Sequence, residues 1–141
     1  MSLYLDASAI LPAFVAEPSS GAVSRYLSQA DEALVVGEFA AAEVASALSR
    51  LTRMGALSSE AAAGHLADFD AWRAAFTEDL DLQASDVRLA NVFVRRFDLG
   101  LRTPDALHVA LCRRIDNTLV TLDRRLAAAA LALGVVADCP A

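Results

Sequence analysis

The chain has 141 residues, a length typical of one compact domain that can bury a core without structural disulfides. Hydrophobic residues make up 56% of it and aromatic residues 6%, yet no apolar stretch reaches the roughly 18 residues that cross a bilayer. The net charge of −6 argues against a protein that binds nucleic acid through its overall field.

Short apolar runs alternate with longer segments of helical spacing. In the first half we expect a strand at 3–5, a helix carrying Ile10 and Phe14, a helix capped by Ser19 or Ser20, a strand at 33–36, a helix at 38–53 and an Ala-rich helix from Ser58 to Phe76. In the second half we expect a strand at 80–82, a helix capped by Ser85, a helix capped by Thr103, a strand at 118–122, a helix at 124–133 and an edge strand at 135–137. This alternation predicts one α/β domain over 1–141, with a central parallel sheet of four to five strands and helices on both faces.

Two acids directly follow predicted strands. Asp6 comes after the strand at 3–5, and Asp123 comes after the strand at 118–122. Ligands of an open parallel sheet bind outside the carboxyl ends of its strands, so both positions are candidates for a functional site. Asp is also a preferred helix N-cap, and for either residue alone that structural role is the simpler interpretation.

Two further acids have different local settings. Asp105 follows Thr103 and Pro104 in what could be an ordinary helix start. Glu43 lies one turn from Ala40 and Ala47, on the helix face expected to be buried, where an unpaired carboxylate would be costly. A divalent cation such as Mg²⁺ or Mn²⁺ would offset that cost, because it prefers carboxylate oxygens and neutralises acids that otherwise repel each other.

Four segments together resemble the PIN-domain family, and specifically its toxin branch of the VapC type. They are Leu3-Tyr4-Leu5-Asp6-Ala7-Ser8-Ala9, Ala42-Glu43-Val44 with Ala47-Leu48, Gly100-Leu101-Arg102-Thr103-Pro104-Asp105-Ala106-Leu107-His108, and Leu119-Val120-Thr121-Leu122-Asp123-Arg124-Arg125-Leu126. The match extends over nearly the whole chain. Many relatives carry Thr or Ser directly after the first Asp, whereas this chain has Ala7, so one supporting hydrogen bond is expected to be missing.

The resemblance implies a Mg²⁺- or Mn²⁺-dependent endoribonuclease, the toxin component of a toxin–antitoxin module. The implied catalytic and metal-binding acids are Asp6, Glu43, Asp105 and Asp123, and the implied supporting hydroxyls are Ser8 and Thr103. It also implies an RNA substrate, a homodimer and a cognate antitoxin whose tail occupies the acidic groove. With no membrane span and no signal segment, we expect the protein in the cytoplasm.

Other interpretations remain at individual positions. All twelve basic residues are Arg, and the doublets at 95–96, 113–114 and 124–125 either contact phosphates or are solvated helix ends. His108 could face the same groove as Asp105, but a histidine that fills space on its helix is the favoured interpretation. A haloacid dehalogenase-type phosphatase would need a second Asp where Ser8 stands, and a phospho-receiver domain would need a Lys, which the chain lacks. The remaining alternative is a catalytically silent PIN-like module that binds RNA or protein.

Overall fold

The computed structural model describes all 141 residues and contains a five-stranded sheet in which every neighbouring pair of strands is parallel. Its strands are β1 (Leu3–Leu5), β2 (Leu34–Val35), β3 (Thr77–Glu78), β4 (Thr118–Val120) and β5 (Ala137–Asp138). They lie in the order β3-β2-β1-β4-β5, with β1 at the centre. The predicted α/β architecture and the number of strands are confirmed.

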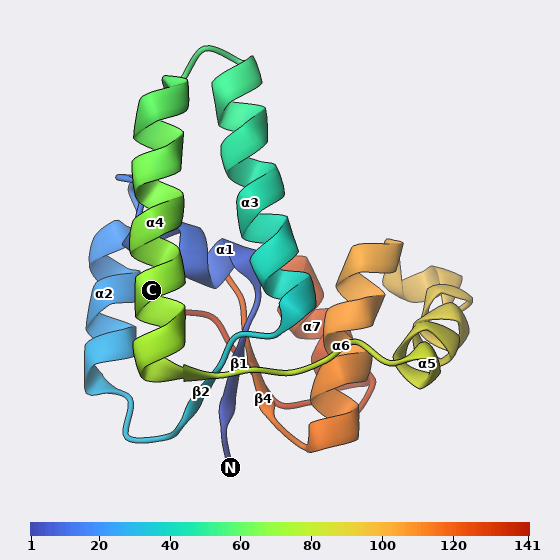
Figure 1. The fold of residues 1–141 in the computed structure, drawn as a ribbon. Helices are drawn as coiled ribbons and strands as arrows, with labels where there is room; N and C mark the ends of the chain where they lie inside the picture. The colour runs from blue at the N-terminus through green and yellow to red at the C-terminus, as the bar shows by residue number, and fades with distance from the viewer.

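Seven α-helices connect and cover the strands. They are α1 (Ala7–Ile10), α2 (Ser20–Gln29), α3 (Glu38–Arg53), α4 (Ser59–Phe76), α5 (Ala84–Val94), α6 (Thr103–Ile115) and α7 (Arg124–Ala132), with short 3₁₀ turns η1 (Leu11–Ala13) and η2 (Phe97–Leu99). Helices α3 and α4 run side by side as a hairpin that extends beyond the sheet (Figure 1). None of the helices combines the length and the apolar character that a bilayer crossing requires.

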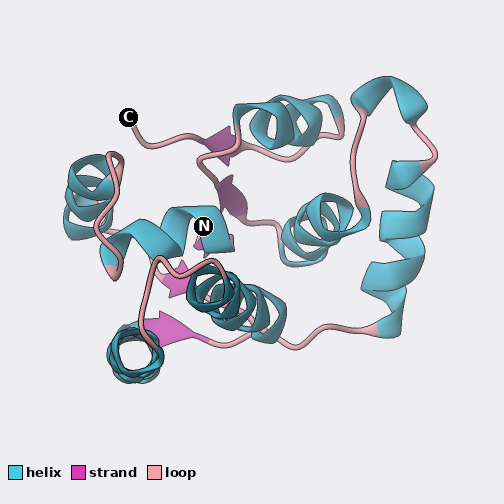
Figure 2. Cartoon of the chain, turned by 90° about the horizontal axis from the view of Figure 1, so that it is seen from above, coloured by secondary structure: helices cyan, strands magenta, loops and turns pink.

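The alternation of side chains along β1 divides the core in two. Tyr4 points to a cluster that includes Leu107 of α6 and Leu126 of α7, whereas Leu3 and Leu5 belong to a second cluster formed with α1, α3 and α4. Figure 2, which views the chain from above, shows helices on both sides of the strands. The prediction that both faces are covered is therefore confirmed, and both clusters are built largely from Ala, Leu and Val.

Two predicted strands are displaced along the sequence. The strand expected at 80–82 is wrong, because α4 passes directly into β3 at Thr77. Leu80 still accepts a hydrogen bond from the amide of Glu38 at 3.0 Å, after which the chain leaves the sheet. The edge strand expected at 135–137 is β5 at Ala137–Asp138, because Val135 is buried in the core before the strand begins.

Two predicted helix starts and one helix end also differ. Helix α5 is capped by Gln83, whose amide donates to Asp86 at 2.8 Å, and not by Ser85. Helix α6 is capped by Arg102 in the same way, so Thr103 is its first helical residue rather than its cap. The first helix ends after one turn at Ile10, and the 3₁₀ turn η1, which contains Pro12, replaces the rest of the predicted helix.

Candidate active site

Asp6 lies where the central strand β1 turns into α1. Its side chain caps the helix by accepting a hydrogen bond from the amide of Ala9 at 3.1 Å, and its own amide donates to the carbonyl of Val120 at 3.2 Å. Only 5% of Asp6 is exposed. Asp6 is therefore the N-cap of α1, one of the two roles predicted for it. It is also a buried acid at the edge of the sheet where ligands bind in such folds.

A hydroxyl network connects the turn after β1 with the turn after β4. Ser8 Oγ donates to Asp6 Oδ1 at 2.6 Å, accepts from the amide of Leu122 at 2.9 Å and lies 3.2 Å from the hydroxyl of Thr121. The Thr121 hydroxyl accepts from the amide of Asp123 at 3.1 Å. The network thus links the carboxylate of Asp6 to the backbone of the turn that carries Asp123.

The surroundings of Asp6 act on its protonation in two directions. Burial raises the pKa of Asp6 above its ordinary value, because a charged carboxylate loses solvation inside the protein. The imidazole of His108 and hydrogen bonds from Ser8, Thr121 and the Ala9 amide act in the opposite direction. Asp6 makes no ion pair with an Arg side chain, so the hydrogen bonds from the Ser8 hydroxyl and the Ala9 amide are its direct stabilising contacts.

Glu43 lies on α3, and its side chain hydrogen-bonds to a histidine. Its Oε1 hydrogen-bonds to Nε2 of His108 on α6, and Nδ1 of the same ring lies 2.6 Å from the phenol oxygen of Tyr4. Side-chain exposure is 29% for Glu43 and 3% for His108. The expected burial of Glu43 is thus partial, and His108 does more than fill space, because both of its ring nitrogens have partners.

Asp105 and Asp123 line the same small surface pocket as Arg102 and Arg125. Asp123 caps α7 by accepting hydrogen bonds from the amides of Arg125 at 3.0 Å and Leu126 at 3.2 Å. Asp105 Oδ2 accepts from the amide of Arg102 at 3.3 Å and lies 3.7 Å from its Nε. This pocket therefore places two acids and two guanidinium groups on one surface.

The elements that carry the predicted acids are linked in pairs by hydrogen bonds, and the four carboxylates do not form one tight cluster. Asp6 is tied to the Asp123 turn through Ser8 and Thr121, and Glu43 is tied to the Asp105 helix through His108. Thr103 is exposed, and no hydrogen bond joins its hydroxyl to a carboxylate. Thr121 was not singled out from the sequence, although a threonine two residues before a strand-end acid is a signal that could have identified it.

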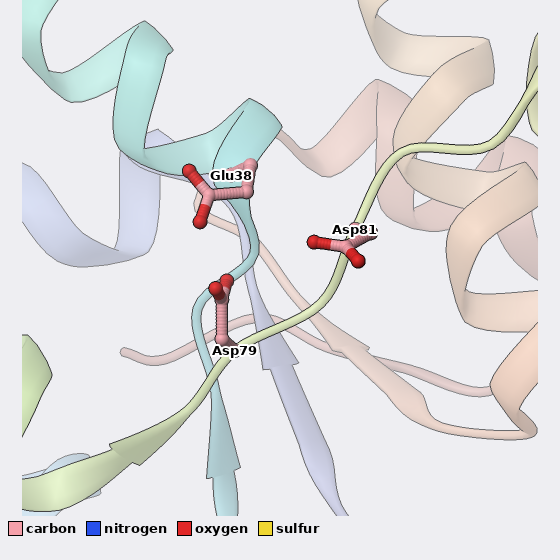
Figure 3. A group of neighbouring side chains, drawn as sticks. All are labelled: Glu38, Asp79 and Asp81. Atoms are coloured by element: carbon pink, nitrogen blue, oxygen red, sulfur yellow. The ribbon is translucent and has the colours of Figure 1, made fainter.

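The closest group of carboxylates lies elsewhere, at the start of α3 and just after β3. Glu38, Asp79 and Asp81 each offer an oxygen, and these oxygens lie within 4.8 Å of one another (Figure 3). Such a triad could bind a metal ion. Arg73 already pairs with Glu38 at 3.3 Å and Asp79 at 2.6 Å, however, so a guanidinium group neutralises part of its charge.

The match to a family model and the similarity to two known proteins indicate the same family. Residues 3–131 match the PIN domain. The chain is 36% identical to Ribonuclease VapC3 of Pyrobaculum aerophilum, over 90% of this chain and 93% of that protein. It is 33% identical to Ribonuclease VapC46 of Mycobacterium tuberculosis, over 99% and 98% of the two chains.

Solved structures agree with this fold. The crystal structure of Mycobacterium tuberculosis VapC20, a Sarcin-Ricin loop cleaving toxin, superposes with a TM-score of 0.72 at 17% identity over 91% of this chain and 95% of that one. Rickettsia felis VapBC2, bound to a DNA fragment from its promoter, gives 0.74 at 13% identity over the full length of both chains. At these identities the likeness establishes the fold alone.

Proposed function

This chain belongs to the PIN-domain family, and we propose that it is a metal-dependent endoribonuclease, the toxin component of a toxin–antitoxin module, that hydrolyses RNA phosphodiester bonds. The observation that carries the proposal is the placement of Asp6 and Asp123 at the ends of adjacent strands, joined by one hydroxyl network. The names of the two sequence relatives supply the reaction, because both are ribonucleases. Asp6, Glu43, Asp105 and Asp123 are the proposed catalytic and metal-binding acids.

The donor set suits Mg²⁺ or Mn²⁺. All four proposed ligands are carboxylates, and neither Asp6 nor Glu43 is paired with an arginine. Mg²⁺ usually keeps several waters and needs only one or two direct carboxylates, so its binding does not require all four acids to be direct ligands. A divalent ion bound there would supply Lewis acidity, which activates water and offsets charge on phosphoryl oxygens.

Two arginines are placed to contact the RNA backbone. Arg102 and Arg125 line the pocket of Asp105 and Asp123, and the Arg102 side chain is 83% exposed. One guanidinium group can donate two parallel hydrogen bonds to the oxygens of a phosphate. The two arginines would thus supply the local positive charge that a chain of net charge −6 needs to bind RNA. Their own contacts within the chain are long, 3.7 Å from Arg102 to Asp105 and 3.4 Å from Arg125 to the Gly100 carbonyl. The doublets at 95–96 and 113–114 make shorter hydrogen bonds within the chain.

The proposed partner is a small antitoxin, and the proposed assembly is a homodimer. Among structural neighbours of the same fold are VapBC-1 of nontypeable Haemophilus influenzae and FitAB bound to a DNA fragment, with TM-scores of 0.69 and 0.62. The surface of this chain also exposes large apolar side chains such as Phe97, at 86%, and Phe76, at 70%, which is common where proteins bind one another.

Inducible expression in bacteria tests the proposal. The wild type should arrest growth and generate discrete new RNA ends, and Asp105→Asn should do neither at equal soluble abundance. Asp116→Asn is a matched control, because Asp116 is exposed and adopts a left-handed conformation that Asn tolerates. Absence of new RNA ends with the wild type would favour the silent RNA- or protein-binding module instead.

A further inference from the structure

His108 lies between the sheet interior and the candidate site. It is carried by α6, one turn beyond Asp105, and it hydrogen-bonds to one residue from β1 and one from α3. Tyr4 of β1 is fully buried, and its phenol group has the His108 ring as its hydrogen-bond partner. On the other side of the ring, Nε2 contacts Oε1 of Glu43. A chain of hydrogen bonds thus leads from the core to one of the four acids.

The number of available hydrogens determines which group donates and which accepts in each of these hydrogen bonds. The buried Tyr4 phenol must donate its hydrogen to avoid an unsatisfied donor, and Nδ1 of His108 is the acceptor within reach. A neutral ring that accepts at Nδ1 carries its hydrogen on Nε2, which faces Glu43. An ionised carboxylate can only accept. The order is therefore Tyr4 to His108 to Glu43, with every hydrogen used.

Aromatic packing keeps the imidazole in this orientation. The Tyr4 ring meets it edge to face, with centroids 5.6 Å apart and planes at 63°. The Phe39 ring lies on it with centroids 5.1 Å apart and planes at 55°. His108 is also almost fully buried, with 3% of its surface exposed. Rotation of the ring would therefore break packing as well as two hydrogen bonds.

We propose that His108 is a positioning residue that holds Oε1 of Glu43 and leaves Oε2 free for the divalent metal, and that Tyr4 orients the His108 ring for this role. The inference rests on the proposed function, because it assigns Glu43 to a metal site. A purely structural role would require only that the buried polar groups be satisfied. A positioning role requires in addition that substitutions of Tyr4 or His108 weaken metal binding, and that they do so only when the Glu43 carboxylate is present.

Mn²⁺ binding to the purified full chain, measured by calorimetry and by the spin-resonance signal of free Mn²⁺, tests the proposal without an activity assay. Tyr4→Phe keeps the ring and removes the donor that orients His108, the outer partner of Glu43. It should weaken Mn²⁺ affinity by up to about tenfold, the lower end of the effect of losing such a partner. Tyr26→Phe is the matched control, because its phenol donates to Asp138 at 2.7 Å and not to His108.

Two further comparisons separate positioning from structural support. In a Glu43→Gln background, Tyr4→Phe should no longer change Mn²⁺ affinity, because the carboxylate that transmits the effect is absent. His108→Gln retains a donor at the place of Nε2 and should bind Mn²⁺ more tightly than His108→Leu. Circular dichroism and thermal unfolding confirm that each variant is folded at the assay temperature.

The outcomes are distinct. Wild-type affinity in folded Tyr4→Phe and His108→Leu would overturn the inference and leave the proposed ribonuclease intact. Equal weakening by Tyr4→Phe with and without the Glu43 carboxylate, or equal affinity of His108→Gln and His108→Leu, would show a structural role only. Failure of the wild type to bind Mn²⁺ at all would instead contradict the proposed metal site, and the inference with it.

Discussion

The hydroxyl of Ser8 donates a 2.6 Å hydrogen bond to the carboxylate of Asp6. The same oxygen accepts the amide of Leu122, 114 residues further along the chain. One small side chain therefore satisfies a buried acid and a backbone donor from the neighbouring strand end. The turn after β1 and the turn after β4 are held together at the point where the candidate site begins.

Ser8→Ala should lower the free energy of unfolding by about 1–3 kcal/mol, because the Leu122 amide and Asp6 both lose a partner in a partly buried place. Urea denaturation followed by circular dichroism measures the change. Ser28→Ala is the control, since the Ser28 hydroxyl donates only to the Arg25 carbonyl on an exposed helix. Equal stability of Ser8→Ala and the wild type would show that water replaces the network.

Mn²⁺ or Mg²⁺ should raise the melting temperature of the wild type, because binding relieves repulsion among the proposed ligands in the folded state alone. At a concentration 100 times the dissociation constant, binding adds about 2.7 kcal/mol. Differential scanning fluorimetry measures the shift, and EDTA should reverse it. Glu43→Gln should reduce the shift more than Glu17→Gln, which alters an exposed glutamate. A metal-independent melting temperature would contradict a shared site.

The stability of the α5–α6 pair should depend on Asp86, which is 1% exposed. Its carboxylate accepts hydrogen bonds from Arg114 at 2.8 and 3.1 Å and from the amide of Gln83 at 2.8 Å. Asp86→Ala should therefore lower the free energy of unfolding by about 1.5–3 kcal/mol, since it removes a buried carboxylate and the charged hydrogen bonds that it accepts. Asp98→Ala removes an exposed surface pair with Arg96 and should change the free energy of unfolding by less than about 1 kcal/mol. Similar curves for the two variants would contradict this.

Much of the fold could be predicted because its signals are local. The strand at 3–5, the helix at 38–53 and the alternation of strands and helices follow from apolar spacing alone. Element ends were less predictable, because they depend on tertiary contacts. Thr77 pairs with Leu34 of β2, and this pairing, which no local pattern encodes, fixes β3 three residues before the predicted strand.

The candidate site was only partly predictable for the same reason. Asp6 and Asp123 follow strands, so their position at one edge of the sheet could be inferred from the chain order. His108 could not be assigned its partners, because Tyr4 is 104 residues away and Glu43 is 65 residues away. The close triad of Glu38, Asp79 and Asp81 was likewise missed, since its members come together only when β3 pairs with β2.

Cleavage of RNA by the purified chain tests the central claim most directly. With Mg²⁺ or Mn²⁺ the wild type should cut a pool of cellular RNA at discrete positions, and EDTA should stop the reaction. Asp6→Asn, which retains an acceptor for the Ala9 amide, should fold but not cut. Equal cleavage by the wild type and by folded Asp6→Asn, or cleavage that persists in EDTA, would contradict the account.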